Sequence, residues 1–259
     1  MSKEMAKYGI EVPGISETSW KGMGSATLQS GVKVVYVGDE EVRQGGVAIM
    51  ISARAKRALM EWNLISKRII KARFYSNYKK LTVIQTYAPT NDAVDEVKDE
   101  FYNQLQGTIS SCNRHDMIVL MGDVKAKIGS NNANREEVKG KCGVGVMKDN
   151  GERPCDCCSA NGLIITGTLF PHKEIHKLTW KSPDGKTVNQ IDHVMNGRMK
   201  TSVLDTRVMR EADVYSDHYL LRSRIRLKLA RAEGMEKARV GFDVRKLQVR
   251  RSGGNTTLR

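Results

Sequence analysis

The feature that most constrains the fold of this chain is a set of short apolar runs, rich in β-branched residues and bounded by turn-forming residues. Such runs are typical of β-strands, because branched side chains pack well on a pleated surface. They predict strands over residues 46–51, 68–74, 81–87, 117–121, 163–166 and 191–195. In the second of these strands, Ile70, Ala72 and Phe74 fall on one face, while Lys71 and Arg73 fall on the other.

A single long helix is predicted between these strands, because apolar residues recur there at intervals of three and four. The members of this stripe are Val94, Val97, Phe101, Leu105 and Ile109. We expect Asn91 or Asp92 to cap the helix. Strands outnumber helices, which predicts an α/β (α+β) fold in which sheets pack together and helices lie outside them.

Length and composition limit the classes of protein to which the chain can belong. It has 259 residues, of which 40% are hydrophobic and 28% charged, as in globular proteins with a buried core. No apolar run reaches the roughly 18 residues of a membrane helix, and the N-terminal residues lack the apolar stretch of a secretory signal. The five cysteines show no disulfide framework. We therefore expect an intracellular protein, nuclear or cytoplasmic, with no membrane partner.

The positive charge is concentrated at the C-terminal end. The chain carries a net charge of +14, and residues 222–259 account for +9 of it, which favours a polyanionic partner. Apolar and basic residues alternate over residues 221–229 and predict a terminal strand with one cationic face. Arg222 and Arg224 on that face either contact a phosphate backbone or only discourage pairing at a sheet edge. We expect one domain over residues 1–230, a disordered basic tail over residues 231–259, and a monomer.

Acidic residues stand at the ends of several predicted strands. Glu17 follows the apolar residues 10–15, Asp123 follows the strand at residues 117–121, and Asp192 interrupts an apolar run. Asp217 and His218 directly precede the terminal strand. Gathered carboxylates repel one another unless a cation neutralises them, and oxygen ligands suit Mg²⁺ or Mn²⁺. Such a metal beside an Asp–His couple is suited to hydrolysis of a phosphodiester.

Five short motifs occur in an order and spacing that resemble the endonuclease/exonuclease/phosphatase superfamily. They are GISETSW at residues 14–20, QTYAPTN at 85–91, GD at 122–123, NQIDH at 189–193 and SDH at 216–218. Within the superfamily, the chain most resembles the apurinic-like endonuclease domain of RTE-type non-LTR retrotransposons and the craniofacial development protein 2-like proteins, over residues 5–230. The resemblance implies a four-layered sandwich of two packed sheets flanked by helices, and a Mg²⁺-dependent endonuclease that acts on DNA.

The resemblance also implies a role for each matching residue. Glu17 and Asp217 look like metal ligands, and Asp123 matches the aspartate that orients or deprotonates the attacking water. Asp192 resembles the acid that orients His218, which would contact the scissile phosphate and stabilise developing charge. The other expected contacts with phosphate or substrate are made by Tyr87, Asn91, Lys125, Arg222 and Arg224.

The chain departs from the family pattern at three points. The pattern opens with a strand that carries an asparagine, whereas this chain is expected to start inside the following helix, near residues 3–8. The motif Gly-Asp-Phe-Asn reads Gly-Asp-Val-Lys here, so that Lys125 replaces an amide and can bind phosphate only as a point charge. Pro13 lies in the strand before Glu17, where a missing N–H donor is tolerated mainly at a sheet edge.

These departures leave alternatives open. Loss of one preorganised polar group costs on the order of 10²–10³ in rate, so the same fold could bind nucleic acid without cleaving it. A phosphoesterase that acts on a lipid or inositol phosphate is a third hypothesis. The cysteine cluster of Cys155, Cys157 and Cys158 lacks a second ligand pair at zinc-site spacing, and we interpret it as small buried thiols.

Overall fold

The structure is a computed structural model that describes residues 1–197 and 202–226. The basic tail predicted over residues 231–259, and the predicted continuation of the terminal strand past residue 226, lie outside the described residues. Within the described residues, none of the helices combines the length and the apolar character needed to cross a membrane.

One layer of the fold is a six-stranded sheet with the strand order β5-β6-β7-β8-β12-β9. β7 and β8 run parallel, and the other neighbours are antiparallel. Its strands match the predicted ranges to within one or two residues, apart from β5, which was not predicted. Their bounds are β5 (Leu59–Ser66), β6 (Ile69–Phe74), β7 (Leu81–Tyr87), β8 (Met117–Asp123), β9 (Leu163–Ile165) and β12 (Asp192–Gly197).

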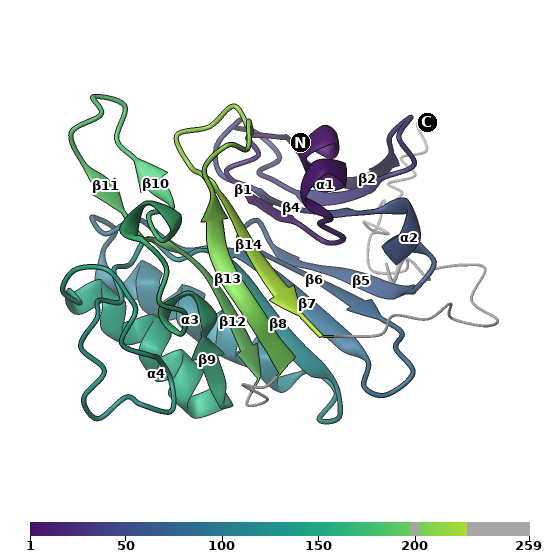
Figure 1. The fold of residues 1–259 in the computed structure, drawn as a ribbon. Helices are drawn as coiled ribbons and strands as arrows, with labels where there is room; N and C mark the ends of the chain where they lie inside the picture. The colour runs from purple at the N-terminus through teal and green to yellow at the C-terminus, as the bar shows by residue number, and fades with distance from the viewer. Residues whose placement is uncertain (198–201, 227–259) are drawn as a thin grey trace, which may run out of the picture.

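The second layer contains a four-stranded antiparallel sheet with the order β1-β4-β3-β2 and a separate antiparallel pair, β13 and β14. A short hairpin of β10 and β11 projects beside this layer (Figure 1). β1 is an edge strand that begins directly after Pro13, so the expectation of an edge position for this proline is confirmed. The bounds are β1 (Gly14–Ser16), β2 (Met23–Thr27), β3 (Lys33–Val37), β4 (Val47–Ile51), β10 (Trp180–Lys181), β11 (Val188–Asn189), β13 (Val203–Met209) and β14 (Leu220–Ile225).

The long helix predicted from the apolar stripe is present as α3. Phe101, Leu105 and Ile109 are buried as expected, but Val94 and Val97 remain 62% and 42% exposed. The predicted cap is wrong: the helix begins only after Val94, because a turn closed by the Ala93 N–H and the Thr90 carbonyl separates it from residues 91–92. The helices are α1 (Ser2–Tyr8), α2 (Ala53–Lys56), α3 (Asp95–Ser110) and α4 (Glu152–Asn161), with 3₁₀ turns η1 (Asp149–Gly151), η2 (Thr166–Thr168) and η3 (Glu174–His176).

Three apolar cores hold the layers together. The first lies between the two sheets and includes Ile49 of β4 and Val119 of β8. The second lies between the six-stranded sheet and helices α3 and α4, and it contains the buried thiols of Cys155, Cys157 and Cys158, all of which are free. The third places Met5 of α1 against β3 and β4. The resulting order of helix, sheet, sheet and helices confirms the predicted four-layered fold (Figure 1).

Candidate active site

Three of the predicted functional side chains lie in one row across the centre of the six-stranded sheet. The parallel register of β7 and β8 places Tyr87 opposite Asp123, and the antiparallel register of β8 and β12 places Asp123 opposite Asp192. Residues opposite one another in neighbouring strands point to the same face of a sheet. The register alone therefore brings a phenol and two carboxylates together at the point where the inner strands β7 and β8 end and β12 begins.

Gly122 is the residue that allows β8 to approach β7 so closely beside this row. Its φ is +146°, and a Cβ at this position would lie 2.0 Å from the carbonyl oxygen of Thr86. Any other residue would push the two strands apart, because this contact is with backbone. The glycine of the Gly-Asp motif thus has a structural reason to precede Asp123.

The second layer supplies the other wall of the site. Glu17 follows β1 in a left-handed conformation with φ of 55°. Ser16 fixes this position, because its hydroxyl donates to the Thr86 carbonyl (3.2 Å) and accepts from Gln85 Nε2 (2.9 Å). His218 precedes β14, and its backbone forms an isolated bridge with Trp180. No pattern in the sequence singled out Ser16 for this role, because an isolated serine has many uses.

Asp192 and His218 form a directed pair. His218 Nδ1 lies 2.8 Å from Asp192 Oδ2, and His218 Nε2 lies 3.8 Å from Asp123 Oδ2. Burial lowers the pKa of His218, but the hydrogen bond with Asp192 and the charges of Asp192 and Asp123 outweigh it and raise that pKa above 6.5. Thr179 holds the start of β12, because its hydroxyl accepts from the backbone N–H groups of Ile191 and Asp192 (3.0 Å each).

Lys125 reaches into the middle of this group of acids. Its Nζ lies 2.7 Å from Asp123 Oδ2 and 3.3 Å from Glu17 Oε1, and 5.3 Å from the ring centroid of Tyr87. The Tyr87 hydroxyl donates to the same Glu17 oxygen. Burial lowers the pKa of Lys125, but the interactions with Asp123 and Glu17 raise it by more than burial lowers it. The net pKa therefore lies well above 10.5. The ammonium is therefore charged at neutral pH and balances the carboxylates around it.

The protonation states of the acids differ because their surroundings differ. Asp123 is 1% exposed. Its burial, and to a smaller extent the charge of Asp192, raise its pKa to about 6, although Lys125 acts to lower it. Burial also raises the pKa of Glu17, but hydrogen bonds from Tyr87 and Lys125 lower it more, so the net pKa lies below 4.5. Burial and the bond with Glu17 raise the pKa of Tyr87 to about 12. Glu17 is thus ionised and Tyr87 remains a donor.

The potential metal ligands of the described residues form one group, which contains Asp123, Asp192 and His218. Each offers one ligand atom within 4.8 Å of the others. Carboxylate oxygens with one imidazole nitrogen suit a hard divalent cation. The two residues expected as metal ligands lie outside this group: Glu17 faces Lys125 and Tyr87, and Asp217 Oδ2 accepts from Trp180 Nε1 (2.7 Å).

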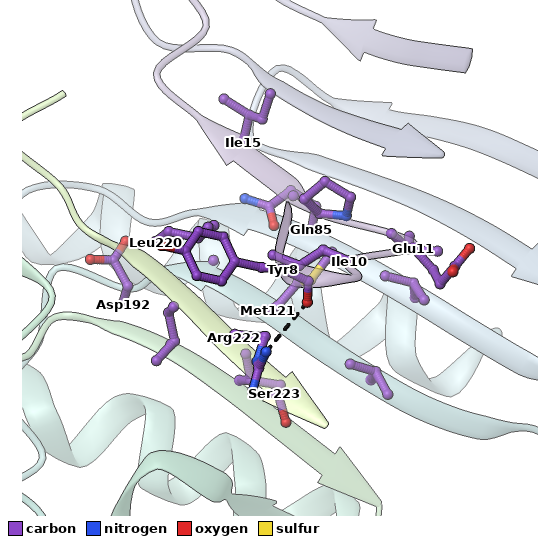
Figure 2. Close-up of a pocket in the computed structure, with 18 of the residues that line it drawn as sticks. Tyr8, Ile10, Glu11, Ile15, Gln85, Met121, Asp192, Leu220, Arg222 and Ser223 are labelled. Atoms are coloured by element: carbon purple, nitrogen blue, oxygen red, sulfur yellow. Dashed lines mark hydrogen bonds between the residues drawn. The ribbon is translucent and has the colours of Figure 1, made fainter. Parts of the chain in front are cut away.

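A cleft of about 1180 Å³ runs from this site between the two layers. Glu17, Asp123, Asp192 and His218 line one end of it. Figure 2 shows Asp192 at this end beside Leu220, and Arg222 of β14 directed toward the α1 side, where its Nη1 donates to the Tyr8 carbonyl (3.3 Å). Four arginines contribute to the lining: Arg54, Arg57, Arg222 and Arg224.

The predicted substrate contacts are therefore divided by the structure. Arg222 and Arg224 both line the cleft. Asn91 stands in an exposed turn and does not line the cleft. The sequence predicted that Lys125 contacts phosphate, but in the structure its ammonium is directed at two carboxylates.

Comparison with known proteins supports the resemblance. The chain is 36% identical over 230 residues to craniofacial development protein 2 of Bos taurus and 35% identical to that of Tragulus javanicus. These matches cover 88% of this chain but 38% and 40% of those proteins, so the chain spans well under half of their length. No model of a known protein family matches the chain.

Solved structures show the same fold. The endonuclease domain of TRAS1, a telomere-specific non-LTR retrotransposon, matches with a TM-score of 0.59 and 14% identity over 87% of this chain and 90% of that one. The AP endonuclease LMAP of Leishmania major has a TM-score of 0.64 at 11% identity, over 86% and 80% of the two chains. An endonuclease/exonuclease/phosphatase family protein of Leptotrichia buccalis has 0.60 at 12% identity, over 87% and 90%. The chain therefore has the endonuclease/exonuclease/phosphatase fold.

Proposed function

We propose that this chain is an endonuclease-like domain that hydrolyses phosphodiester bonds of nucleic acid, with DNA as the substrate, assisted by Mg²⁺ or Mn²⁺. The observation that carries the proposal is the Asp192–His218 pair, which lies beside the buried Asp123 at the end of a cleft lined by four arginines. This arrangement combines a base, a cation and an anion-binding surface in one place.

Asp123 is suited to accept the proton of an attacking water. A carboxylate with a pKa of about 6 is a stronger base than an ordinary aspartate and is still largely ionised at neutral pH. Its Oδ1 accepts from the backbone N–H of Lys125 (3.0 Å), which fixes the orientation of the carboxylate. Asp123 therefore acts as the general base.

His218 is suited to stabilise the charge that develops on the phosphate. Asp192 holds Nδ1 and favours the protonated ring, so that Nε2, which is 3.8 Å from Asp123 Oδ2, can donate to a phosphoryl oxygen. A divalent cation bound by Asp123 and Asp192 would supply additional positive charge that polarises the same oxygens. Arg222 and Arg224 bind the flanking phosphates as diffuse backbone contacts.

The proposal also covers the evolutionary origin of the chain, its oligomeric state and its cellular compartment. We propose that the chain derives from the endonuclease domain of a non-LTR retrotransposon, which is supported by the likeness to the TRAS1 domain. It acts as a monomer, since one chain supplies all of the residues named above. A nucleic-acid substrate places it in the nucleus or the cytoplasm.

Nicking of a supercoiled plasmid in Mg²⁺ tests the proposal. We expect the purified chain to convert supercoiled into open-circular DNA, and His218→Ala to reduce the rate by about 10²-fold or more, as for loss of one preorganised group. Asp156→Asn is the matched control, because Asp156 is an exposed residue of α4 that pairs with Arg135. Equal rates for the wild type and His218→Ala would refute the assignment.

One observation favours a second candidate, a fold that binds nucleic acid without cleaving it. Lys125 already neutralises Glu17 and Asp123, and a site that is filled by its own cation needs no catalytic ion to be stable. In this case the arginines of the cleft would carry the function, and binding would depend on salt but not on the acids.

Binding of DNA by Asp123→Ala separates this candidate from the first, and the salt dependence of binding tests the arginines that both candidates use. Arg224→Ala should weaken binding to all sequences and reduce the slope of log K against log salt by about 1. Arg114→Ala is the control, because Arg114 is exposed in the turn before β8. It therefore lies at the opposite end of this strand from Asp123. Binding that survives Asp123→Ala, in a chain that nicks no DNA, would favour the second candidate. An unchanged slope in Arg224→Ala would remove Arg224 from the interface.

A further inference from the structure

The ammonium of Lys125 occupies the space between two carboxylates that approach from different sheets. Asp123 ends β8 of the six-stranded sheet, and Glu17 follows β1 of the other layer. Nζ is 2.7 Å from one carboxylate and 3.3 Å from the other. A hard cation held by both layers would be expected at this point, because only a positive charge makes the approach of two carboxylates favourable.

The backbone holds Lys125 in this position from both sides. Its N–H donates to Asp123 Oδ1, its carbonyl accepts from Asn150 Nδ2 (3.0 Å), and its φ is 51°, in the left-handed region. A β-branched or bulky residue rarely adopts this conformation. Backbone bonds on both sides of the Cα therefore direct the side chain back over Asp123, against the ring of Tyr87.

We propose that Lys125 is a tethered cation that competes with a divalent metal for Glu17 and Asp123. In the chain as it stands, the ammonium pairs with both carboxylates, and Glu17 lies outside the group of potential metal ligands. A metal that uses Asp123 must displace Nζ or accept a second positive charge beside it, and either requirement weakens its binding. When Nζ leaves, Glu17 becomes available as an additional ligand.

The flexible lysine stem makes this displacement possible. Four methylene groups allow Nζ to move without a change of the backbone, and in its displaced position the ammonium can meet a phosphate of the substrate as a point charge. This inference rests on the proposed function for its biological meaning, but the competition itself concerns only the ion and the protein.

Binding of Mn²⁺ to the purified full chain without DNA tests the competition, with the free ion followed by electron paramagnetic resonance. Lys125→Met keeps the length of the side chain and removes its charge, and we expect Mn²⁺ to bind about 10–100-fold more tightly, the range by which neighbours of a metal site change its affinity. Lys125→Arg keeps the charge and should bind Mn²⁺ no more tightly than the wild type does.

Two controls locate the effect. Lys127→Met removes a partly buried lysine of the same segment that forms no ion pair within the described residues, and it should leave the Mn²⁺ affinity unchanged. Adding Glu17→Gln to Lys125→Met should abolish most of the gain, whereas Glu17→Gln alone should have little effect. If Lys125→Met does not fold by near-ultraviolet circular dichroism, Lys125→Gln serves the same comparison.

Equal Mn²⁺ affinity of the wild type and the neutral variant would overturn the inference, as would an equal gain in Lys127→Met. The outcome is distinct from that of the proposed function. If Lys125→Met binds Mn²⁺ tightly but neither the wild type nor any variant nicks DNA, the inference about the tethered cation stands and the proposed nuclease activity is refuted.

Discussion

In the proposed function, the protonation states of Asp123 and His218 set the pH range in which the site is active. Burial and the charge of Asp192 raise the pKa of Asp123 to about 6, so that the base is ionised only above this pH. Against the opposing effect of burial, Asp192 raises the pKa of His218 above 6.5, so that the ring remains protonated to higher pH. The proposed function needs ionised Asp123 together with protonated His218, which predicts a bell-shaped dependence of kcat/KM on pH.

Asp192→Asn tests this electrostatic arrangement. The charge of Asp192 raises the pKa of both partners, and its removal should lower both values. The rising limb of the profile, near pH 6 in the wild type, and the falling limb should therefore both move to lower pH, while Asp156→Asn should leave them in place. Cleavage of a labelled DNA duplex across the pH range measures the profile. Limbs that stay fixed, or that move to higher pH, would contradict the assigned roles.

The residue scale also shows how far the sequence could predict the site. Motif order predicted the meeting of Glu17, Asp123, Asp192 and His218, because each stands next to an apolar run whose place in a sheet is well determined. Asp217 is adjacent to His218 in the sequence, but its carboxylate binds Trp180 instead. The position of the Lys125 ammonium could not be predicted, because it depends on a long side chain and on a left-handed backbone.

At the scale of elements, the inner strands β6, β7, β8 and β12 of the six-stranded sheet were predicted, as was its edge strand β9, whereas the edge strands β5 and β2 were missed. All residues of β7 are buried, and its sequence is rich in the β-branched and aromatic residues that favour strands. β2 and β5 stand at sheet edges and keep several exposed or half-exposed residues, so their sequences lack that signal. Edge strands with a mixed surface are common because they resist pairing with other chains.

The segment between β8 and α4 begins with the loop that carries Lys125, and a buried lysine holds it. Lys139 is 0% exposed, and its Nζ donates to the carbonyls of Ile128 and Gly129. Its backbone also forms a bridge with Ile165 of β9. The middle of the segment is thereby attached to β9, an edge strand of the six-stranded sheet.

Burial lowers the pKa of Lys139 from 10.5, which makes the stability of this segment depend on pH. Between the lowered pKa and 10.5, the unfolded chain binds more protons at this residue than the folded chain does, so folding becomes more favourable as pH rises. Between neutral and alkaline pH, the free energy of unfolding of the wild type should therefore increase relative to that of Lys139→Met. Urea titrations at each pH measure both free energies.

Lys139→Arg provides the comparison, because an arginine stays charged throughout this range and should lack the same rise. A difference in free energy of unfolding between the wild type and Lys139→Met that stays constant would show that Lys139 titrates in the folded protein as it does in the unfolded chain. A difference that shrinks with rising pH would show a raised pKa, and either result would contradict the prediction.

At the scale of the whole molecule, one cleft between the two layers contains both the acidic candidate site and the basic lining residues. The carboxylates and His218 lie at one end of it, and arginines from α2, its C-cap and β14 contribute to its lining. The four-layered fold was predicted from the motif order and confirmed by solved structures at 11–14% identity. Sequences this different conserve the layers because burial patterns, and not particular side chains, specify how sheets pack.

The most direct measurement is the rate of plasmid nicking as a function of Mg²⁺ concentration for the wild type, Lys125→Asn and His218→Ala. The account predicts nicking by the wild type, the same reaction at lower Mg²⁺ concentrations when Lys125 no longer competes, and a rate reduced by about 10²-fold or more in His218→Ala. Absence of nicking by both the wild type and Lys125→Asn at every concentration, or nicking that His218→Ala leaves intact, would contradict it.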